Sequence, residues 1–400
     1  MNYIDPATGA SYPLDSARWC SDSGGYLNLS PSPGLKRSDI QSSRYSVWRY
    51  AKAIGVDEKH AVTLGEGWTP LVCGEWLSGQ HRAQVMFKLE FMMPTGSFKD
   101  RGMTVLVSYL KSLGINNVLE DSSGNAGASL SAYAAAAGMR CRILVPETAS
   151  YAKIAQIAAG RADVLTIRGT RQDVADAALR MSREIFYASH NWQPFFAEGT
   201  KTLAYELWEQ LGFKAPDNVI VPLGYGSNVA GCERGFGELL RNGEIAKMPR
   251  IFGVQAANCA PYFNAWQAGV EHLVATEVTP TIAEGIASSR PTRVAEALRA
   301  VRNSGGSIVA VTEDEIVAAL GVLARKGLYV EPTSAAAGAG LTQLLASGAV
   351  KPNESTVLVL TGTGLKASEK IGQLLELRAR APAATQTPPV MATSKSPSSG

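Results

Sequence analysis

The sequence has few cysteines and little net charge, and these shortages exclude several classes of protein. Its 400 residues include only five cysteines, which stand far apart with no CxxC pair, so neither a zinc site nor a disulfide framework is expected. The formal net charge is +3, and the charged residues are spread along the chain rather than gathered in a basic stripe. Nucleic acid and anionic membranes are therefore not the expected partners, and a small molecule is.

Long apolar runs are also missing. No stretch of about 18 consecutive apolar residues occurs, and residues 1–15 lack the basic and apolar regions of a signal peptide. A cytoplasmic protein without a membrane span is therefore expected. Histidine is scarce as well, and the four histidines lie apart without the neighbouring pattern of a hydrolase triad. We interpret them as structural or surface residues: His60, His81, His190 and His272.

The chain is long and apolar enough for about two domains with full cores, since 46% of its residues are hydrophobic. In residues 61–380, short Val/Ile/Leu runs alternate with Ala-rich amphipathic stretches. This alternation predicts an α/β protein with two open, twisted parallel sheets and helices on both faces. The expected strands are Val85–Leu89, Val118–Asp121, Cys141–Val145, Val164–Arg168, Val219–Leu223, Ile251–Val254, Ile308–Val311 and Thr356–Leu360. The expected helices are Lys99–Leu113, Ala126–Ala137, Ala152–Ala159, Gln172–Phe186, Lys201–Leu211, Ala230–Arg241, Val294–Ser304, Glu313–Lys326 and Ser334–Ala346.

Composition changes along the chain predict four segments. Residues 1–60 are rich in Ser, Gly, Pro and Tyr and are expected to form an extension packed on the core. Residues 61–205 and 206–380 are expected to form an N-terminal and a C-terminal α/β half. Residues 381–400 consist largely of Pro, Thr, Ser and Ala and are predicted to be disordered.

A loop between an expected strand and a long helix contains a lysine in an unusual position. It reads PTGSFKDRG (94–102), and the spacing of Ser97 and Asp100 is that of a capping box, which places Lys99 in the first helical turn. The helix dipole disfavours a cation there, and a lysine with a lowered pKa is suited to imine formation. The local context is equally compatible with a solvated surface lysine.

Three further strand-to-helix loops are rich in Gly, Ser, Thr and Asn. SSGNAG (122–127) enters an Ala-rich helix, where its serines are natural caps and Asn125 offers a carboxamide to a ligand. LGYGSNVAG (223–231) lets successive backbone N–H groups converge on an anion, although a Gly-rich turn alone is weak support for function. It matches neither the dinucleotide nor the Walker pattern. In TGTGLK (361–366), Thr361 is either a helix cap or a partner for a ring nitrogen.

Taken together and in this order, these loops resemble the fold-type II pyridoxal-phosphate (PLP) enzymes, and among them the threonine synthases most closely. The resemblance covers about residues 60–375 and rests on EGWTPL (66–71), PTGSFKDRG (94–102), SSGNAG (122–127), EGTKTLAYEL (198–207), PLGYGSN (222–228), EPTSAAAGAGL (331–341) and TGTGLK (361–366). It implies PLP in a cleft between the two α/β halves, with Lys99 forming the Schiff base. It also implies that Asn125 bonds the phenolic oxygen, that Thr361 bonds the pyridine nitrogen, and that a loop holds the cofactor phosphate: Gly224, Tyr225, Gly226, Ser227 and Asn228.

The resemblance also implies a reaction and an assembly. Threonine synthases convert O-phospho-L-homoserine and water to L-threonine and phosphate, with the released lysine as acid and base. Such enzymes are usually homodimers. The substrate phosphate then needs a second anion site, and the candidates are Thr95, Ser97, Ser123, Ser150 and Lys153.

Two departures from the family pattern leave other reactions open. The family's phosphate loop usually reads Gly-Asn-Gly/Ala-Gly-Asn, whereas this chain has Tyr225 and Ser227 at the second and fourth positions. Paired cysteines found at the start of some relatives are also missing. The alternatives are a serine/threonine or diaminopropionate ammonia-lyase, a phosphoserine-using synthase such as cysteate synthase, or a non-catalytic PLP-binding protein.

Overall fold

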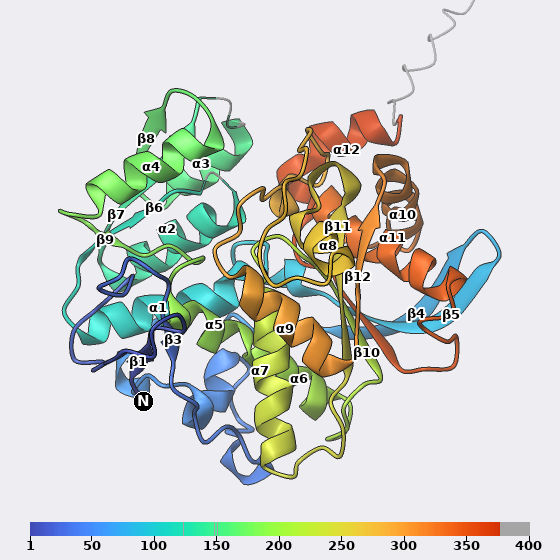
Figure 1. The fold of residues 1–400 in the computed structure, drawn as a ribbon, viewed down its shortest axis with the longest axis horizontal. Coiled ribbons are helices and arrows are strands. Elements are labelled where there is room, and N and C mark those ends of the chain that lie inside the picture. The colour runs from blue at the N-terminus through green and yellow to red at the C-terminus, as the bar shows by residue number, and fades with distance from the viewer. Residues whose placement is uncertain (123, 148, 150, 377–400) are drawn as a thin grey trace, which may run out of the picture.

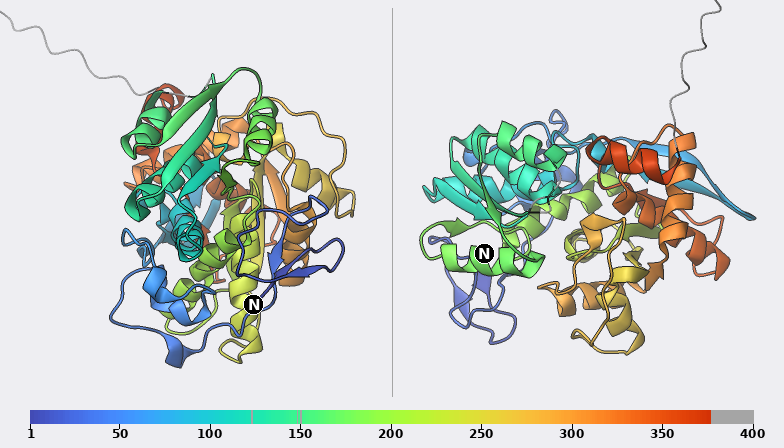
Figure 2. Two further views of the ribbon diagram at one scale, coloured as in Figure 1. Left: turned by 90° about the vertical axis from the view of Figure 1, so that its left-hand side faces the viewer. Right: turned by 90° about the horizontal axis from the view of Figure 1, so that it is seen from above.

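The computed structural model describes residues 1–122, 124–147, 149 and 151–376. Two sheets of different size lie in separate lobes, each with helices on both faces, and a small sheet is formed near the N-terminus (Figures 1 and 2). The α/β fold class predicted from the sequence is confirmed.

The larger sheet has six strands in the order β12-β11-β10-β13-β5-β4, and all neighbours are parallel except the β4–β5 pair at one edge. Its strands are β4 (Leu71–Ser78), β5 (His81–Lys88), β10 (Asn218–Pro222), β11 (Arg250–Ala256), β12 (Ile308–Val311) and β13 (Thr356–Val359). Successive side chains of a strand point to opposite faces of the sheet, so neighbouring residues of β10 lie in different apolar cores. Val219 and Val221 share an apolar core with the helices α6 (Thr202–Gln210), α7 (Ser227–Arg241) and α9 (Val294–Ser304). Ile220 lies in the core on the other face, formed with α10 (Glu313–Arg325) and α11 (Pro332–Ala346).

Five of the helices described for this lobe lie where the sequence predicts them, and two short ones do not. The helices are α6 (Thr202–Gln210), α7 (Ser227–Arg241), α8 (Pro261–Gln267), α9 (Val294–Ser304), α10 (Glu313–Arg325), α11 (Pro332–Ala346) and α12 (Ser368–Leu374). The short helices α8 and α12 were not predicted, because seven residues give too few turns for a periodic pattern.

The smaller sheet has four parallel strands in the order β8-β7-β6-β9. These are β6 (Asn117–Glu120), β7 (Arg140–Pro146), β8 (Asp163–Ile167) and β9 (Phe186–Tyr187). Helices α1 (Lys99–Ser112), α2 (Asn125–Ala137) and α3 (Tyr151–Ala159) contribute to the core on one face, and α4 (Arg171–Met181) covers the other. Helix α5 (Pro194–Thr200) then leads back toward α6.

The chain crosses between the lobes more often than a simple division into halves implies. Strands β4 and β5 belong to residues 61–205, yet β5 pairs with β13 in the sheet otherwise built from residues 206–380. Helix α1, which follows β5, packs in the other lobe. Its first residue, Lys99, therefore lies at a crossing between the two lobes.

The N-terminal segment lies against α1 and α5. Its three short strands, β1 (Tyr3–Ile4), β2 (Ser11–Tyr12) and β3 (Asn28–Leu29), form an antiparallel sheet. The Tyr3 hydroxyl donates to the Tyr109 hydroxyl at 2.6 Å, and the Tyr109 ring stacks on Phe195 with centroids 3.7 Å apart. Trp48 Nε1 donates to Thr104 Oγ1 at 2.9 Å. Buried contacts thus attach this segment to the smaller lobe.

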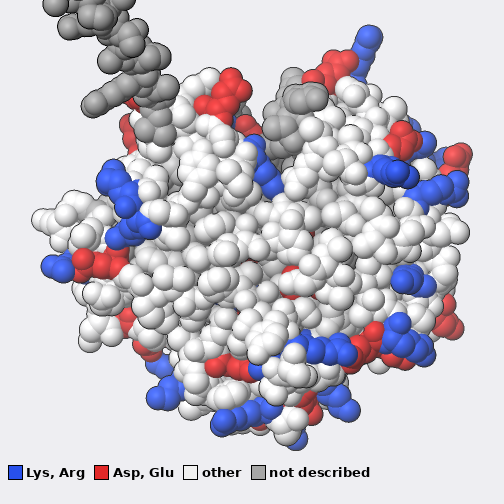
Figure 3. All heavy atoms as spheres, turned by 180° about the vertical axis from the view of Figure 1, so that it is seen from behind, with Lys and Arg blue, Asp and Glu red and all other residues white. Residues whose placement is uncertain are grey.

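Four structural findings concern membrane spans, metal ligands, cysteines and surface charge in the described part of the chain. None of its helices has the length and apolar content that a membrane crossing needs. No group of three or more His, Cys, Asp or Glu residues is arranged there to hold a metal ion. All five cysteines are free thiols. Lys and Arg are interspersed with Asp and Glu on the face shown in Figure 3.

Candidate active site

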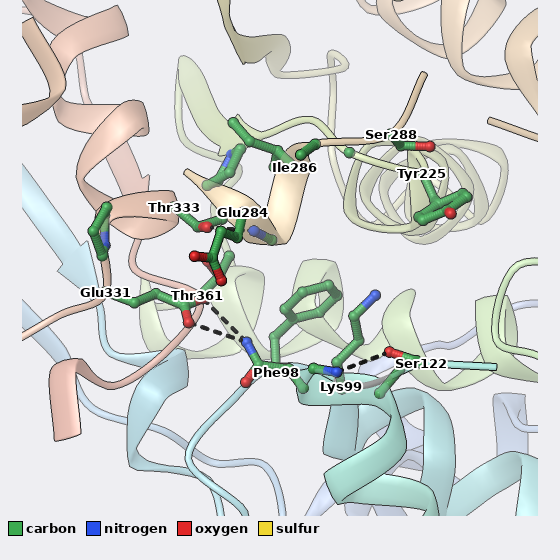
Figure 4. A pocket seen from close by; sticks show the side chains of 18 of the residues that line it. Phe98, Lys99, Ser122, Tyr225, Glu284, Ile286, Ser288, Glu331, Thr333 and Thr361 are labelled. Atoms are coloured by element: carbon green, nitrogen blue, oxygen red, sulfur yellow. Dashed lines mark hydrogen bonds between the residues drawn. The ribbon is translucent and has the colours of Figure 1, made fainter. Parts of the chain in front are cut away.

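A cavity of about 230 Å³ lies at the carboxyl ends of the parallel strands and is bordered by all four of the predicted loops. Phe98 and Lys99 reach it from the loop after β5, Ser122 and Asn125 from the loop after β6, and Thr361 from the loop after β13. The loop after β10 contributes Gly224, Tyr225, Gly226, Ser227 and Asn228. Figure 4 shows Lys99 and Tyr225 on opposite sides of this cavity, which Ile286 and Ser288 also line.

Lys99 is the first residue of α1, as the sequence predicts, but the predicted capping box is wrong. The N-cap is Phe98, and no side-chain hydrogen bond caps the helix. The Asp100 carboxylate instead accepts from the backbone N–H and the hydroxyl of Thr95, at 2.7 and 2.6 Å, and from Ser129. Asp100 therefore holds Thr95 in the turn that precedes Lys99, and it does not accept from the backbone N–H of Ser97 as a capping box requires.

The surroundings of Lys99 favour its neutral amine. Burial lowers the pKa of Lys99 to about 8, although the carboxylates of Glu120 and Glu331 act in the opposite direction. Its Nζ lies 4.7 Å from the ring centroid of Phe98 and 5.5 Å from that of Phe196. A lysine amine that loses its proton this near neutral pH is a competent nucleophile toward a carbonyl carbon.

The loop after β10 forms a cradle for an anion at the N-terminus of α7. Gly226 adopts φ +89°, and a Cβ atom there would lie 2.8 Å from Cβ of Ala297. The first backbone N–H groups of the 15-residue helix have no partner within the helix, and its dipole adds to their attraction for negative charge. Oδ1 of the buried Asn228 has no hydrogen-bond partner among the described residues. These features fit a phosphate group.

Thr361 and Asn125 also border the cavity. The Thr361 hydroxyl lies 3.1 Å from Ser334 Oγ. Asn125 donates from Nδ2 to both carboxylate oxygens of Glu331, at 3.1 and 3.3 Å, and its Oδ1 accepts from Lys366 at 3.0 Å. The carboxamide of Asn125 is thus oriented by two charged side chains that also line the cavity.

The structure does not bring the described candidates for the second anion site together at the cavity. Thr95 and Ser97 are buried and are not among the residues that line the cavity, and the Ser97 hydroxyl has no hydrogen-bond partner among the described residues. Lys153 lies in α3, but its side chain is outside the described residues. Ser123 and Ser150 also lie outside them.

The cavity contains charged groups that the sequence reasoning missed. Arg171 lines it and pairs with Asp121 at 2.7 Å, and Lys366, Lys370, Glu284 and Glu331 line it as well. Helical residues such as Arg171 and Lys370 carried no recognisable signal. The Glu120-Asp121 pair, in contrast, stands directly before SSGNAG at the end of a strand, where side chains meet a ligand edge.

His190 also lines the cavity, so the prediction that no histidine joins the site is wrong. Its ring is buried and lies 5.6 Å from Tyr225 and 5.5 Å from Phe196, measured between centroids. The Nδ1 atom is 3.2 Å from Oε2 of Glu120. Because His190 follows the short strand β9, which no sequence pattern predicts, its position could not be read from the sequence.

Comparison with known proteins gives a consistent result. Residues 62–362 match the family model described as pyridoxal-phosphate dependent enzyme. The chain is 36% identical over 368 residues to a threonine synthase of Methanocaldococcus jannaschii, covering 90% of this chain and 91% of that protein. It is 37% identical over 317 residues to a threonine synthase of Mycobacterium tuberculosis, covering 78% and 85%.

Solved structures share the fold at lower sequence identity. The processed form of threonine deaminase isoform 2 from Solanum lycopersicum superposes with a TM-score of 0.67 at 23% identity, covering 88% of this chain and 98% of that one. The serine racemase of maize gives a TM-score of 0.63 at 20% identity, covering 77% and 92%. At these identities the likeness concerns the fold alone.

Proposed function

The chain belongs to the family of pyridoxal-phosphate-dependent enzymes and has a threonine synthase-like function, and from this premise we propose that it converts O-phospho-L-homoserine and water to L-threonine and phosphate. The observation that carries the proposal is the meeting of Lys99, the Gly224–Asn228 cradle and Thr361 around one cavity. The threonine synthase relatives provide the substrate and the reaction. The proposed reaction is the elimination of the γ-phosphate followed by addition of water at the β-carbon.

The residues of the cavity fit the cofactor. In this proposal, Lys99 holds PLP covalently, and the cradle at the N-terminus of α7 binds its phosphate through backbone N–H groups and Ser227. Thr361 would bond the pyridine nitrogen, and Asn125, which donates to Glu331 in this structure, would bond the phenolic oxygen. When bound, PLP supplies the electron sink for carbanion chemistry at the substrate.

The protein's own contribution is to move protons and to hold the substrate. We assign to Lys99 the proton transfers at the α, β and γ carbons, because its amine has a pKa of about 8 after burial and can act as base and acid near neutral pH. The rings of Phe98 and Phe196 beside its Nζ restrict access of water to this amine.

A phosphorylated substrate is consistent with the charges around the cavity. Besides Lys99, the described lining residues include three basic side chains (Arg171, Lys366 and Lys370) and two acidic ones (Glu284 and Glu331). The candidates Thr95, Ser97, Ser123, Ser150 and Lys153 remain part of the proposal for the phosphate of the substrate. A homodimer and a cytoplasmic location also remain predictions from the resemblance and the sequence.

The test is phosphate release from O-phospho-L-homoserine by the purified, PLP-loaded protein, with amino-acid analysis of the product. Stoichiometric threonine and phosphate are expected. Absence of turnover, with a PLP absorbance that Lys99→Ala abolishes, would keep the cofactor site and overturn the proposed reaction. Serine, phosphoserine and diaminopropionate are the comparison substrates, because the rival reactions use them.

A further inference from the structure

His190 and Glu120 form a buried pair at the wall of the cavity. Glu120 ends strand β6 and is fully buried, and its Oε2 accepts from the backbone N–H of His190 at 3.1 Å. The same oxygen lies 3.2 Å from Nδ1 of the ring, and Oε1 accepts from the backbone N–H of Asp121 at 3.1 Å. Because Glu120 engages Nδ1, Nε2 is the ring nitrogen left for a molecule in the cavity.

The protonation state of this pair determines whether Nε2 accepts or donates a hydrogen bond. With one proton in total, the pair is an anion, the ring carries its proton on Nδ1 toward the carboxylate, and Nε2 is a bare acceptor. With two protons the pair is neutral. Either both protons are on the ring, or Glu120 is protonated and donates to Nδ1. In both of these arrangements Nε2 carries a hydrogen that points away from Glu120.

We propose that His190 is a substrate-contacting residue whose Nε2–H, made available when the Glu120–His190 pair takes up one proton, donates to the anionic departing group of the substrate. The inference rests on the proposed function, because a departing phosphate is the anion that this reaction brings into the cavity. It gives a role in substrate specificity to a histidine that contacts Tyr225, one of the two residues at which the phosphate loop departs from the family pattern.

The groups around the pair support proton exchange at this position. Burial lowers the pKa of His190 well below its ordinary value, and the charges of Lys99 from α1 and Arg171 from α4 lower it further, whereas Asp121 raises it. Burial likewise raises the pKa of Glu120, against hydrogen bonds from Asp121 and His190. An anion beside Nε2 adds negative charge, which favours the neutral pair over the anionic one.

Two aromatic neighbours fix the position of the imidazole. The rings of Phe196 and Tyr225 both meet His190 edge to face. The Tyr225 backbone is itself held, because the hydroxyl of Tyr262 donates to its carbonyl oxygen at 3.1 Å. Glu120, Phe196 and Tyr225 therefore hold the imidazole at the wall of the cavity.

The experiment is calorimetric titration of the PLP-loaded protein with sulfate, an analogue of the phosphate dianion that does not itself titrate near neutral pH. Titrations in two buffers of different ionisation enthalpy, from about pH 6 to 9, measure proton uptake. We expect sulfate to bind more weakly as pH rises, with uptake of up to one proton. In His190→Asn both the uptake and the pH dependence should disappear, and affinity should fall about tenfold or more. His81→Asn, at a partly exposed histidine in β5, is the matched control and should behave as wild type.

A second variant separates the pair from the fold around it. Glu120→Gln should abolish proton uptake while PLP absorbance is retained, and it serves as the test if His190→Asn fails to load PLP. Sulfate binding that is equally tight and equally pH-dependent in wild type and in both variants would overturn the inference. Failure of the wild type to turn over O-phospho-L-homoserine would instead overturn the proposed reaction, and the sulfate results would still decide the role of His190.

Discussion

The backbone N–H of Phe98 donates to the carbonyl oxygen of Thr361 at 2.9 Å, so the loop that carries Lys99 is joined directly to the loop after β13. The Thr363 N–H donates in the opposite direction, to Gly96, at 3.0 Å. The cause lies in the sheet. Strands β5 and β13 are parallel neighbours, and Lys88 pairs with Val359, so the loops that follow them meet at one edge.

The titration of Lys99 in the cofactor-free protein gives the first prediction. Because burial lowers the pKa of Lys99 to about 8, the fraction of neutral amine rises through that pH. The rate at which PLP is taken up covalently should therefore rise with a midpoint near pH 8, followed by absorbance in a stopped-flow instrument. A midpoint above about pH 10, the ordinary range of a lysine, would contradict the burial of this amine.

The same shift predicts a stability effect with a defined sign. A lysine whose folded-state pKa lies below its unfolded value destabilises the fold while it is charged, and this cost is relieved as pH rises from about 8 to about 10.5. Cofactor-free Lys99→Met should therefore be more stable than cofactor-free wild type at pH 7, and the difference should shrink above pH 8. Urea unfolding at several pH values measures it. The control is Lys247→Met, at an exposed lysine, for which we expect no such stabilisation at pH 7.

A buried ion network behind the site gives a prediction about folding. Arg101 pairs with Glu90 at 2.6 Å and with Glu206 at 2.9 Å, and Lys88 also pairs with Glu206, all at fully buried side chains. Arg101→Met leaves buried carboxylates without this partner and should lower the free energy of unfolding by about 3–5 kcal/mol. Lys247→Ala breaks the exposed pair with Asp217 and should cost less than about 1 kcal/mol. If Arg101→Met and Lys247→Ala lowered the free energy of unfolding equally in denaturant titrations, the buried network would contribute no more to stability than an exposed pair.

Acid should weaken the same network. Burial alone would raise the pKa of Glu206, but the charges of Arg101 and Lys88 prevail and lower it to about 2. A carboxyl group whose folded-state pKa is depressed contributes stability above its unfolded pKa of about 4.5, and this contribution is lost as pH falls toward 2. Unfolding free energies of Glu206→Gln should therefore vary less than those of wild type between pH 4.5 and 2, at a lower overall stability. If the free energy of unfolding of Glu206→Gln depended on pH as steeply as that of wild type, the lowered pKa of Glu206 would not be the cause of the acid sensitivity.

The sequence predicts the parallel core more reliably than the edges and the site charges. All eight expected strands are present, because apolar runs such as Val219–Leu223 are buried on both faces of a sheet. Strand β4 was missed because residues of an edge hairpin, such as Val72 and Leu77, are exposed and follow no buried pattern. His190 and Arg171 were missed for another reason. Their position at the cavity depends on tertiary packing of short elements, which local sequence does not encode.

The cradle at the N-terminus of α7 gives the last prediction. Gly226 adopts φ +89°, and an added methyl group would lie 2.8 Å from Cβ of Ala297, so Gly226→Ala must shift either the loop or α9. Backbone N–H groups then move away from the proposed phosphate position, and PLP affinity should fall by about tenfold or more, measured by equilibrium titration of the cofactor-free protein. Gly243→Ala is the matched control, because Gly243 also has a positive φ of +72° but no atom within 4 Å of an added Cβ. The control carries the same kind of backbone strain without touching the loop, so it should lower stability and leave PLP affinity unchanged. Equal losses of PLP affinity in both variants would show that strain, rather than the geometry of the cradle, controls cofactor binding.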